Sequence, residues 1–169
     1  MGRRKQASGF TSLEMVVVVG IIGILTVAAI PSVLNSMATR NLDNSARDIQ
    51  TTLQQARYRA VDTKINHRVR FAQTSGTWMI YLERETAPNT WAAVPKYLVK
   101  AISTKYTVTI NLPAGQAIEF SSVGVIEGFD STKNSVTLQS LALKTKGQPD
   151  LRIIRVFGGG SIRYDRGSS

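Results

Sequence analysis

The chain begins with a short basic segment that is followed at once by a long run without charge. No side chain from Met15 to Thr39 is charged, and Arg3–Lys5 places three positive charges before the run. A helix of this length can cross the hydrocarbon core of a bilayer, which is about 30 Å thick. We therefore predict a transmembrane helix over residues 10–34, and the basic residues place its N-terminus in the cytoplasm.

One carboxylate, Glu14, lies at the N-terminal end of this apolar run. A charge inside a membrane helix costs roughly 2.5–3.5 kcal/mol on insertion scales and usually marks a specific partner. A secretory signal peptide cleaved behind Ala28–Ala29 fits the segment poorly, because Glu14 would then lie in its apolar core. The pattern therefore indicates a retained segment in which Glu14 has a function.

The residues Gly9-Phe10-Thr11-Ser12-Leu13-Glu14 resemble the class III leader of type IV prepilins and type II secretion pseudopilins. In that family a membrane-embedded peptidase cuts after the glycine and methylates the new N-terminal residue. The resemblance implies a leader of residues 1–9, cleavage between Gly9 and Phe10, and N-methylation of Phe10. It also implies that Glu14 pairs with the N-terminal amine of a neighbouring subunit, with a pair inside one helix as the alternative.

A helical period continues beyond the apolar run to about Asp62 and becomes amphipathic over residues 35–62. Its apolar stripe consists of Leu42, Ala46, Ile49, Leu53, Ala56 and Ala60. Charged residues off the stripe are expected to form a solvated or inter-subunit face: Arg40, Asp43, Arg47, Asp48, Arg57 and Arg59. The sequence therefore predicts one helix over residues 10–62.

From His67 onward the apolar period changes to two, which is typical of strands. Expected strands are 69–71, 77–82, 107–110, 117–120, 135–138, 151–156 and 161–164. Turn signals separate them, including Gly147–Asp150 and the glycine run 158–160. We expect the glycine run to be flexible. The predicted fold class is α+β: a long N-terminal helix packed on an antiparallel sheet or two small sheets, with residues 63–169 as a β-rich head.

The second half of the chain also resembles a known family. Ile118-x-Phe120, Gly124, the apolar run 152–156 and a glycine turn into Ile162-x-Tyr164 are similar to the minor pseudopilin branch, which includes the type II secretion H-type subunit. The resemblance implies a structural subunit of a secretion pseudopilus, held in the inner membrane by a single pass with its head in the periplasm. The implied partners are other pilins or pseudopilins, prepilin peptidase and the inner-membrane assembly platform.

Two other functions remain open at this point. A related minor pilin of a type IV pilus, with DNA binding in natural transformation, is the first alternative. A membrane-anchored periplasmic binding protein that never polymerises is the second, and Glu14 argues against it.

Little in the composition supports catalysis. The chain has one histidine and no cysteine, so we expect neither an enzyme nor a cofactor or metal site. His67 is expected at the surface or in a turn. Asp130 offers a weak calcium site together with the oxygens of Ser131, Thr132 and Asn134, and a plain polar turn is preferred because the segment has one carboxylate.

Basic residues gather near the C-terminus of a chain whose formal net charge is +10: Arg152, Arg155, Arg163 and Arg166. Such a density of positive charge attracts polyanions such as DNA without reading sequence. DNA-binding minor pilins have a Gly-Arg-x-Arg motif at the corresponding turn, and this chain has Ser161 in place of the first arginine. We therefore favour an edge strand protected by charge over a nucleic-acid site.

Overall fold

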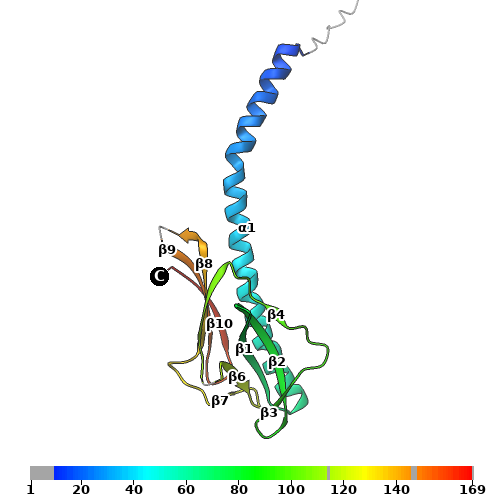
Figure 1. Cartoon of the computed structure of the whole chain (residues 1–169), viewed down its shortest axis with the longest axis vertical. Coiled ribbons are helices and arrows are strands. Elements are labelled where there is room, and N and C mark those ends of the chain that lie inside the picture. The colour runs from blue at the N-terminus through cyan, green and yellow to red at the C-terminus, as the bar shows by residue number, and fades with distance from the viewer. Residues whose placement is uncertain (1–9, 114, 146–147, 169) are drawn as a thin grey trace, which may run out of the picture. The chain divides into compact units, whose positions relative to one another are not determined.

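The computed structural model describes residues 10–113, 115–145 and 148–168, which form one helix and ten strands (Figure 1). The chain divides into two compact units, residues 1–37 and 38–169. The helix α1 (Ser12–Thr63) contributes to both units and matches the predicted helix within two residues at its N-terminus and one at its C-terminus. The transmembrane helix expected over 10–34 is not identified: no helix of the described residues combines the length and the apolar character needed to cross a membrane.

Within the second unit, α1 is the spine of the hydrophobic core. All six residues of the predicted stripe are fully buried, with exposures of 0 % from Leu42 to Ala60. One polar residue of the helix, Thr52, is buried with them. Its hydroxyl lies 2.8 Å from the carbonyl oxygen of Asp48 and 2.9 Å from the hydroxyl of Tyr97. The amphipathic pattern therefore identified the buried face correctly.

The first sheet has six strands, and every pair is antiparallel. Its order is β3-β2-β1-β6-β7, with β4 paired to β2. The strands are β1 (His67–Thr74), β2 (Thr77–Ala87), β3 (Thr90–Ala93), β4 (Lys100–Ala101), β6 (Ala117–Phe120) and β7 (Ile126–Glu127).

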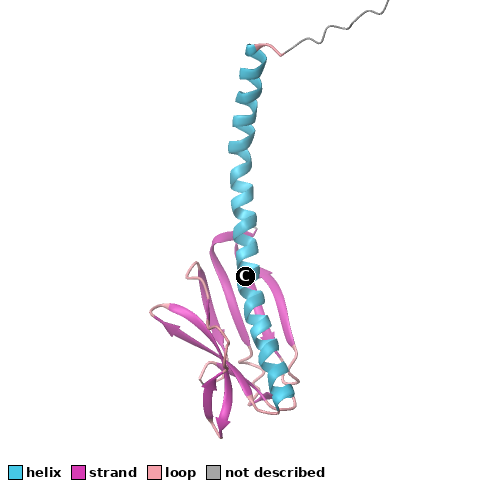
Figure 2. Ribbon diagram, turned by 90° about the vertical axis from the view of Figure 1, so that its right-hand side faces the viewer, coloured by secondary structure: helices cyan, strands magenta, loops and turns pink. Residues whose placement is uncertain are grey.

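The second sheet has four antiparallel strands in the order β10-β9-β8-β5. In Figure 2 the strands of the head, in magenta, lie beside the C-terminal part of α1. Its strands are β5 (Tyr106–Asn111), β8 (Ser135–Thr145), β9 (Gln148–Val156) and β10 (Ile162–Ser168). Of the two arrangements predicted, the structure therefore has two small sheets.

Alternate residues of both sheets join the helical stripe in one buried cluster. Its sheet members are Val69, Phe71, Ile80, Leu82, Ile118, Phe120, Val136, Leu138, Ile154 and Val156. Each buried side chain of this size contributes about 1.5–3 kcal/mol of transfer free energy. This shared core explains how a head without cysteine holds both sheets on the helix.

The strand predictions were correct in position for seven strands, but β3, β4 and β7 were missed. The predicted turn over Gly147–Asp150 is wrong for Gln148 onward, because β9 already begins at Gln148. Pro149 is tolerated near the start of β9 because its register partner there is Lys144 of β8, while β10 pairs only from Asp150.

Candidate functional site

The N-terminal motif begins at the edge of the described part of the chain. Gly9 lies outside the described residues, so the processing prediction at Gly9 and Phe10 is not addressed by the structure. Phe10 precedes α1, and 74 % of its surface is exposed. Glu14 lies in the first turn of the helix, as expected from its position in the motif.

Thr11 and Glu14 cap this helix end reciprocally. The backbone N–H of Glu14 donates to the hydroxyl oxygen of Thr11 at 3.2 Å, and the backbone N–H of Thr11 donates to a carboxylate oxygen of Glu14 at 3.5 Å. This arrangement is a capping box, and the Thr-x-x-Glu spacing is its sequence signature. Sequence reasoning missed it, although Thr11-Ser12-Leu13-Glu14 carries the signal. Glu14 therefore has a local structural role besides any pairing with another subunit.

The helix of the first unit exposes an almost continuous apolar surface. The large apolar side chains from Phe10 to Met37 that are exposed by 40 % or more include Leu13, Val16, Val19, Ile22, Ile24, Leu25, Val33 and Leu34. Exposed apolar surface of this extent marks a site that another apolar phase or another protein covers.

The second unit fixes Arg152 in its interior, where 2 % of the residue is exposed. Its Nε donates to Asp43 on α1 at 2.5 Å, and its Nη1 donates to Asp150 at 2.6 Å. Asp43 also accepts hydrogen bonds from the hydroxyl of Tyr164 at 2.8 Å and from Nη2 of Arg166 at 2.5 Å. One carboxylate of the helix thus binds three donors of the second sheet.

These contacts set the ionisation of the network. Burial alone would raise the pKa of Asp43, but the hydrogen bonds from Arg152 and Tyr164 and the charges of both arginines lower it below its ordinary value. Burial opposes the charged form of Arg152, yet the hydrogen bonds to Asp150 and Asp43 raise its pKa. Asp43 was expected on a solvated or inter-subunit face, and that expectation is wrong because Asp43 pairs with this buried guanidinium of its own head.

The four arginines considered as a surface for binding polyanions therefore differ in their surroundings. Arg152 is buried, which removes it from that group. Arg155 forms an ion pair with Asp165 at 2.7 Å, and Arg166 is paired with Asp43. Arg163 is exposed, with its guanidinium 5.6 Å from the ring centre of Phe157. Because two of the three exposed arginines are neutralised, the cluster is a weaker attractor of phosphate than its sequence suggests.

Arg57 of α1 joins two glycine turns. Its Nε donates to the carbonyl oxygen of Gly124 at 2.9 Å, and its Nη2 donates to that of Gly159 at 3.2 Å. Gly124 and Gly160 have φ of 83° and 77°, values that favour glycine. A Cβ on Gly160 would lie 2.1 Å from the Gly124 oxygen. Arg57 was expected on a solvated or inter-subunit face, and it instead binds two turns of its own head. The glycine run was expected to be flexible, and it forms a tight turn closed by backbone hydrogen bonds between Phe157 and Ser161 and between Gly160 and Phe157.

Glu83 on the first sheet is another carboxylate with two arginine partners, and unlike the half-buried Asp43 it is buried. Its oxygens accept hydrogen bonds from Arg68 at 2.6 Å and from Arg70 at 2.8 Å. Burial would raise the pKa of Glu83, and the hydrogen bonds from Arg70 and Arg68 outweigh it and lower the value. The two guanidiniums also lie over aromatic rings, Arg68 over Trp91 at 4.3 Å and Arg70 over Tyr81 at 4.5 Å.

Two smaller expectations are decided by the structure. His67 is not a surface residue, because it begins β1 with 2 % of its surface exposed and its Nδ1 lies 2.8 Å from the carbonyl oxygen of Ile65. Burial lowers its pKa.

Asp130 accepts hydrogen bonds from the backbone N–H and the hydroxyl of Thr132 at 2.8 and 2.7 Å, so the segment is the polar turn that was preferred.

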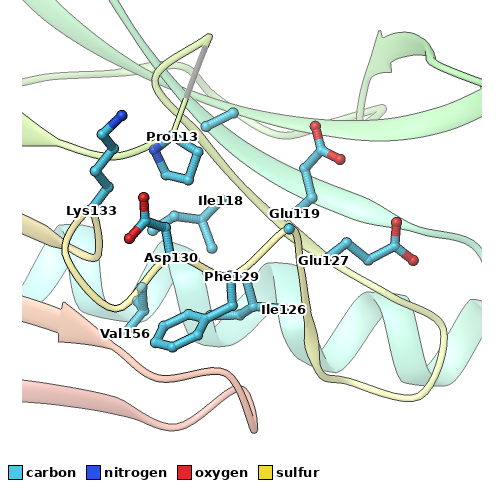
Figure 3. A pocket seen from close by; sticks show the side chains of 11 residues that line it. Pro113, Ile118, Glu119, Ile126, Glu127, Phe129, Asp130, Lys133 and Val156 are labelled. Atoms are coloured by element: carbon cyan, nitrogen blue, oxygen red, sulfur yellow. The ribbon is translucent and has the colours of Figure 1, made fainter.

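A pocket of about 330 Å³ lies beside β6 and β7 (Figure 3). Ile118, Ile126, Phe129 and Val156 supply apolar side chains to its lining. Its charged residues are Glu119, Glu127, Asp130 and Lys133, so the lining is acidic on a chain with an excess of basic residues. In Figure 3 the carboxyl groups of Glu119 and Glu127 lie on one side of the pocket and Lys133 lies on the other.

In a comparison with known families, the model of the type II transport protein GspH matches residues 45–160. The matched range covers α1 from Ser45 onward, both sheets as far as the turn before β10, and the glycines that Arg57 brings together. No curated protein and no solved structure matches the chain at a significant level.

Proposed function

Because the chain belongs to the type II transport protein GspH family, we propose that it is a structural minor pseudopilin of a type II secretion pseudopilus. The family match over residues 45–160 is the observation that carries this proposal. The role is mechanical rather than catalytic, as suits a family of structural subunits. Other pseudopilins are its partners in the filament.

The exposed apolar surface of the first unit supports the finer parts of the proposal. Before assembly, residues 10–34 lie in the inner membrane with the head in the periplasm. In the filament, the helices of neighbouring subunits replace the lipid around the same side chains. The uncharged run from Met15 to Thr39 and the basic residues before it support this orientation.

Processing by prepilin peptidase is the next part of the proposal. The peptidase removes residues 1–9 and methylates Phe10, and the assembly platform then receives the mature chain. Mass spectrometry of the protein extracted from membranes tests this step directly. A mature N-terminus at methylated Phe10 is expected, whereas an intact Met1 or a cut after Ala29 would refute it.

Glu14 has two roles that a pair of variants can separate. Gln also serves in a capping box, so Glu14→Gln keeps the helix cap and removes the charge, whereas Glu14→Ala removes the charge and the side-chain half of the cap. If pairing with a neighbour's amine sets the register, both variants should be processed normally and both should fail to enter filaments. Normal assembly of Glu14→Gln with failure of Glu14→Ala would assign Glu14 to the cap alone.

The function itself is tested by deleting the gene and measuring secretion by the type II system. Loss of secretion, restored by the wild-type chain, is the expected result. Normal secretion together with a defect in pilus-dependent motility or DNA uptake would instead favour a minor pilin of a type IV pilus.

A further inference from the structure

Two contacts fix the direction in which the second sheet runs along α1. Asp43 of the helix binds Arg152 of β9, and Arg57, further along the helix, binds Gly159 in the turn that follows β9. The helix rises about 21 Å between its two residues, and an extended strand covers about 23 Å between the other two. β9 therefore runs parallel to α1, and the residues before Arg152 extend back toward the end of the head at which α1 enters it (Figure 1).

The hairpin of β8 and β9 reaches that end of the head. β9 begins at Gln148, which an extended strand places about 13 Å before Arg152. On α1, the second unit begins at Ala38, about 8 Å before Asp43 along the helix axis. The hairpin therefore extends at least as far as the helical residue at which the head begins.

The exposed side chains at this end include an apolar group and two cations. Leu141 follows Gln139 of β8, the register partner of Leu151, and is 66 % exposed. Its backbone N–H donates to the carbonyl oxygen of Lys105 at 3.4 Å, which places the exposed Lys105 at the same end. Arg40 is exposed on α1 just after the start of the second unit. The ion pairs found among the described residues include neither Arg40 nor Lys105.

The carboxylates nearest to this end do not cancel these charges. Asp43 binds Arg152 and Arg166, and Asp150 binds Arg152. Two carboxylates are thus matched by two arginines. The positive charges of the other two cations therefore remain available to an anionic surface.

We propose that this end of the head, through Leu141, Lys105 and Arg40, rests on the anionic lipid headgroups of the inner membrane before the subunit enters a filament. The inference rests on the proposed function, in which residues 10–34 lie in that membrane. The membrane is the partner that the chain itself selects, because α1 continues from this end of the head into residues 10–34. Each basic residue near an anionic surface strengthens binding about five-fold, and Leu141 adds apolar surface that leaves water.

Quenching of a fluorescent label at position 141 by lipid tests the contact. The chain contains no cysteine, so Leu141→Cys in the full chain accepts a single label. The labelled protein is reconstituted into vesicles of phosphatidylglycerol and phosphatidylcholine in equal parts, or of phosphatidylcholine alone, and both contain a lipid with a spin label on its headgroup. The control is Val123→Cys, a 73 % exposed position beside Gly124 in a turn that Arg57 binds. We expect quenching at position 141 in the anionic vesicles, lost at high salt or in phosphatidylcholine alone, and little quenching at position 123 in either vesicle.

Neutral substitutions give a second readout on the same label. Arg40→Gln combined with Lys105→Gln should lower the ratio of docked to undocked heads about 25-fold. The matched control, Arg59→Gln combined with Lys64→Gln, removes the same charge from exposed positions near the other end of α1 and should leave quenching unchanged. Equal effects of the two double variants would show that net charge alone attracts the head, which would overturn the proposal.

Flotation of the vesicles separates the contact from the function. If the full chain floats with the vesicles and the label at position 141 is not quenched, the contact is wrong and the secretion subunit stands. Equal quenching at positions 141 and 123, or in both kinds of vesicle, would also overturn the contact. Protection of position 141 from a water-soluble quencher in native membranes, without quenching by lipid in vesicles, would assign this end of the head to a membrane protein instead. A chain that does not float with the vesicles would overturn both the contact and the membrane segment of the proposed function.

Discussion

Removing the carboxylate of Asp43 should destabilise the head far more than removing the equivalent carboxylate of an exposed ion pair. Asp43→Ala deletes one acceptor that serves Arg152, Tyr164 and Arg166. Arg152 then remains 2 % exposed with Asp150 as its remaining carboxylate partner. The loss in free energy of unfolding therefore depends on a buried guanidinium that keeps one of its two carboxylate partners.

The magnitude follows from the burial of the partners. Breaking a buried ion pair by removing one partner costs about 3–5 kcal/mol. Because Asp150 still binds Arg152, we expect the lower end of that range, about 3 kcal/mol. The control Asp165→Ala breaks the pair with Arg155, whose side chain is 44 % exposed, and should cost about 0–1 kcal/mol.

Denaturant unfolding of the full chain in detergent, followed by circular dichroism, measures the difference. Asp43→Ala should lower the free energy of unfolding by at least about 2 kcal/mol more than Asp165→Ala. Equal effects of the two variants would show that the network around Arg152 does not hold the second sheet on the helix.

Three further outcomes are expected. Gly160→Ala should destabilise the head by at least about 2 kcal/mol in the same assay, because of its positive φ and the clash with the Gly124 oxygen, while Gly159→Ala meets nothing within 4 Å and should be nearly neutral. The pKa values of Asp43 and Glu83 are lowered on folding, so their contribution to stability is present above the ordinary carboxyl pKa values of 3.8 and 4.5 and is lost as the pH falls below them. Acid titration of the unfolding midpoint measures this loss, and a stability independent of pH below 4.5 would contradict it. In an anisotropy assay at physiological salt, binding to duplex DNA should be marginal, and a tight complex that the Arg163→Ala variant abolishes would favour DNA uptake over the proposed function.

Much of the fold could be predicted because its signals are periodic. The stripe from Leu42 to Ala60 repeats at steps of four and three, and each of the longer strands alternates over enough residues to define a face. The strands β4 and β7 have two residues each, which is too short for any alternation. These strands are defined by their hydrogen bonds to neighbouring strands, and two residues of local sequence cannot predict that pairing.

The charged residues show where the prediction of sites failed and why. Arg152 has the same parity along β9 as Ile154 and Val156, so its burial could have been inferred from alternation. Its partner on α1 could not, because pairing Asp43 with Arg152 requires knowing how the helix lies on the second sheet. His67 was expected at the surface or in a turn because the local sequence does not reveal that β1 pairs with β6, about fifty residues away.

The two carbonyl contacts of Arg57 have a mechanical consequence. The turns at Gly124 and Gly159 follow strands of different sheets, and one helical side chain holds both. A pull along α1 thus reaches the two sheets in parallel rather than one after the other. If the helix of a filament subunit pushes its head against a load, the force would pass from α1 to both sheets through Arg57 as well as through the hydrophobic core. Neither sheet would then bear the whole load.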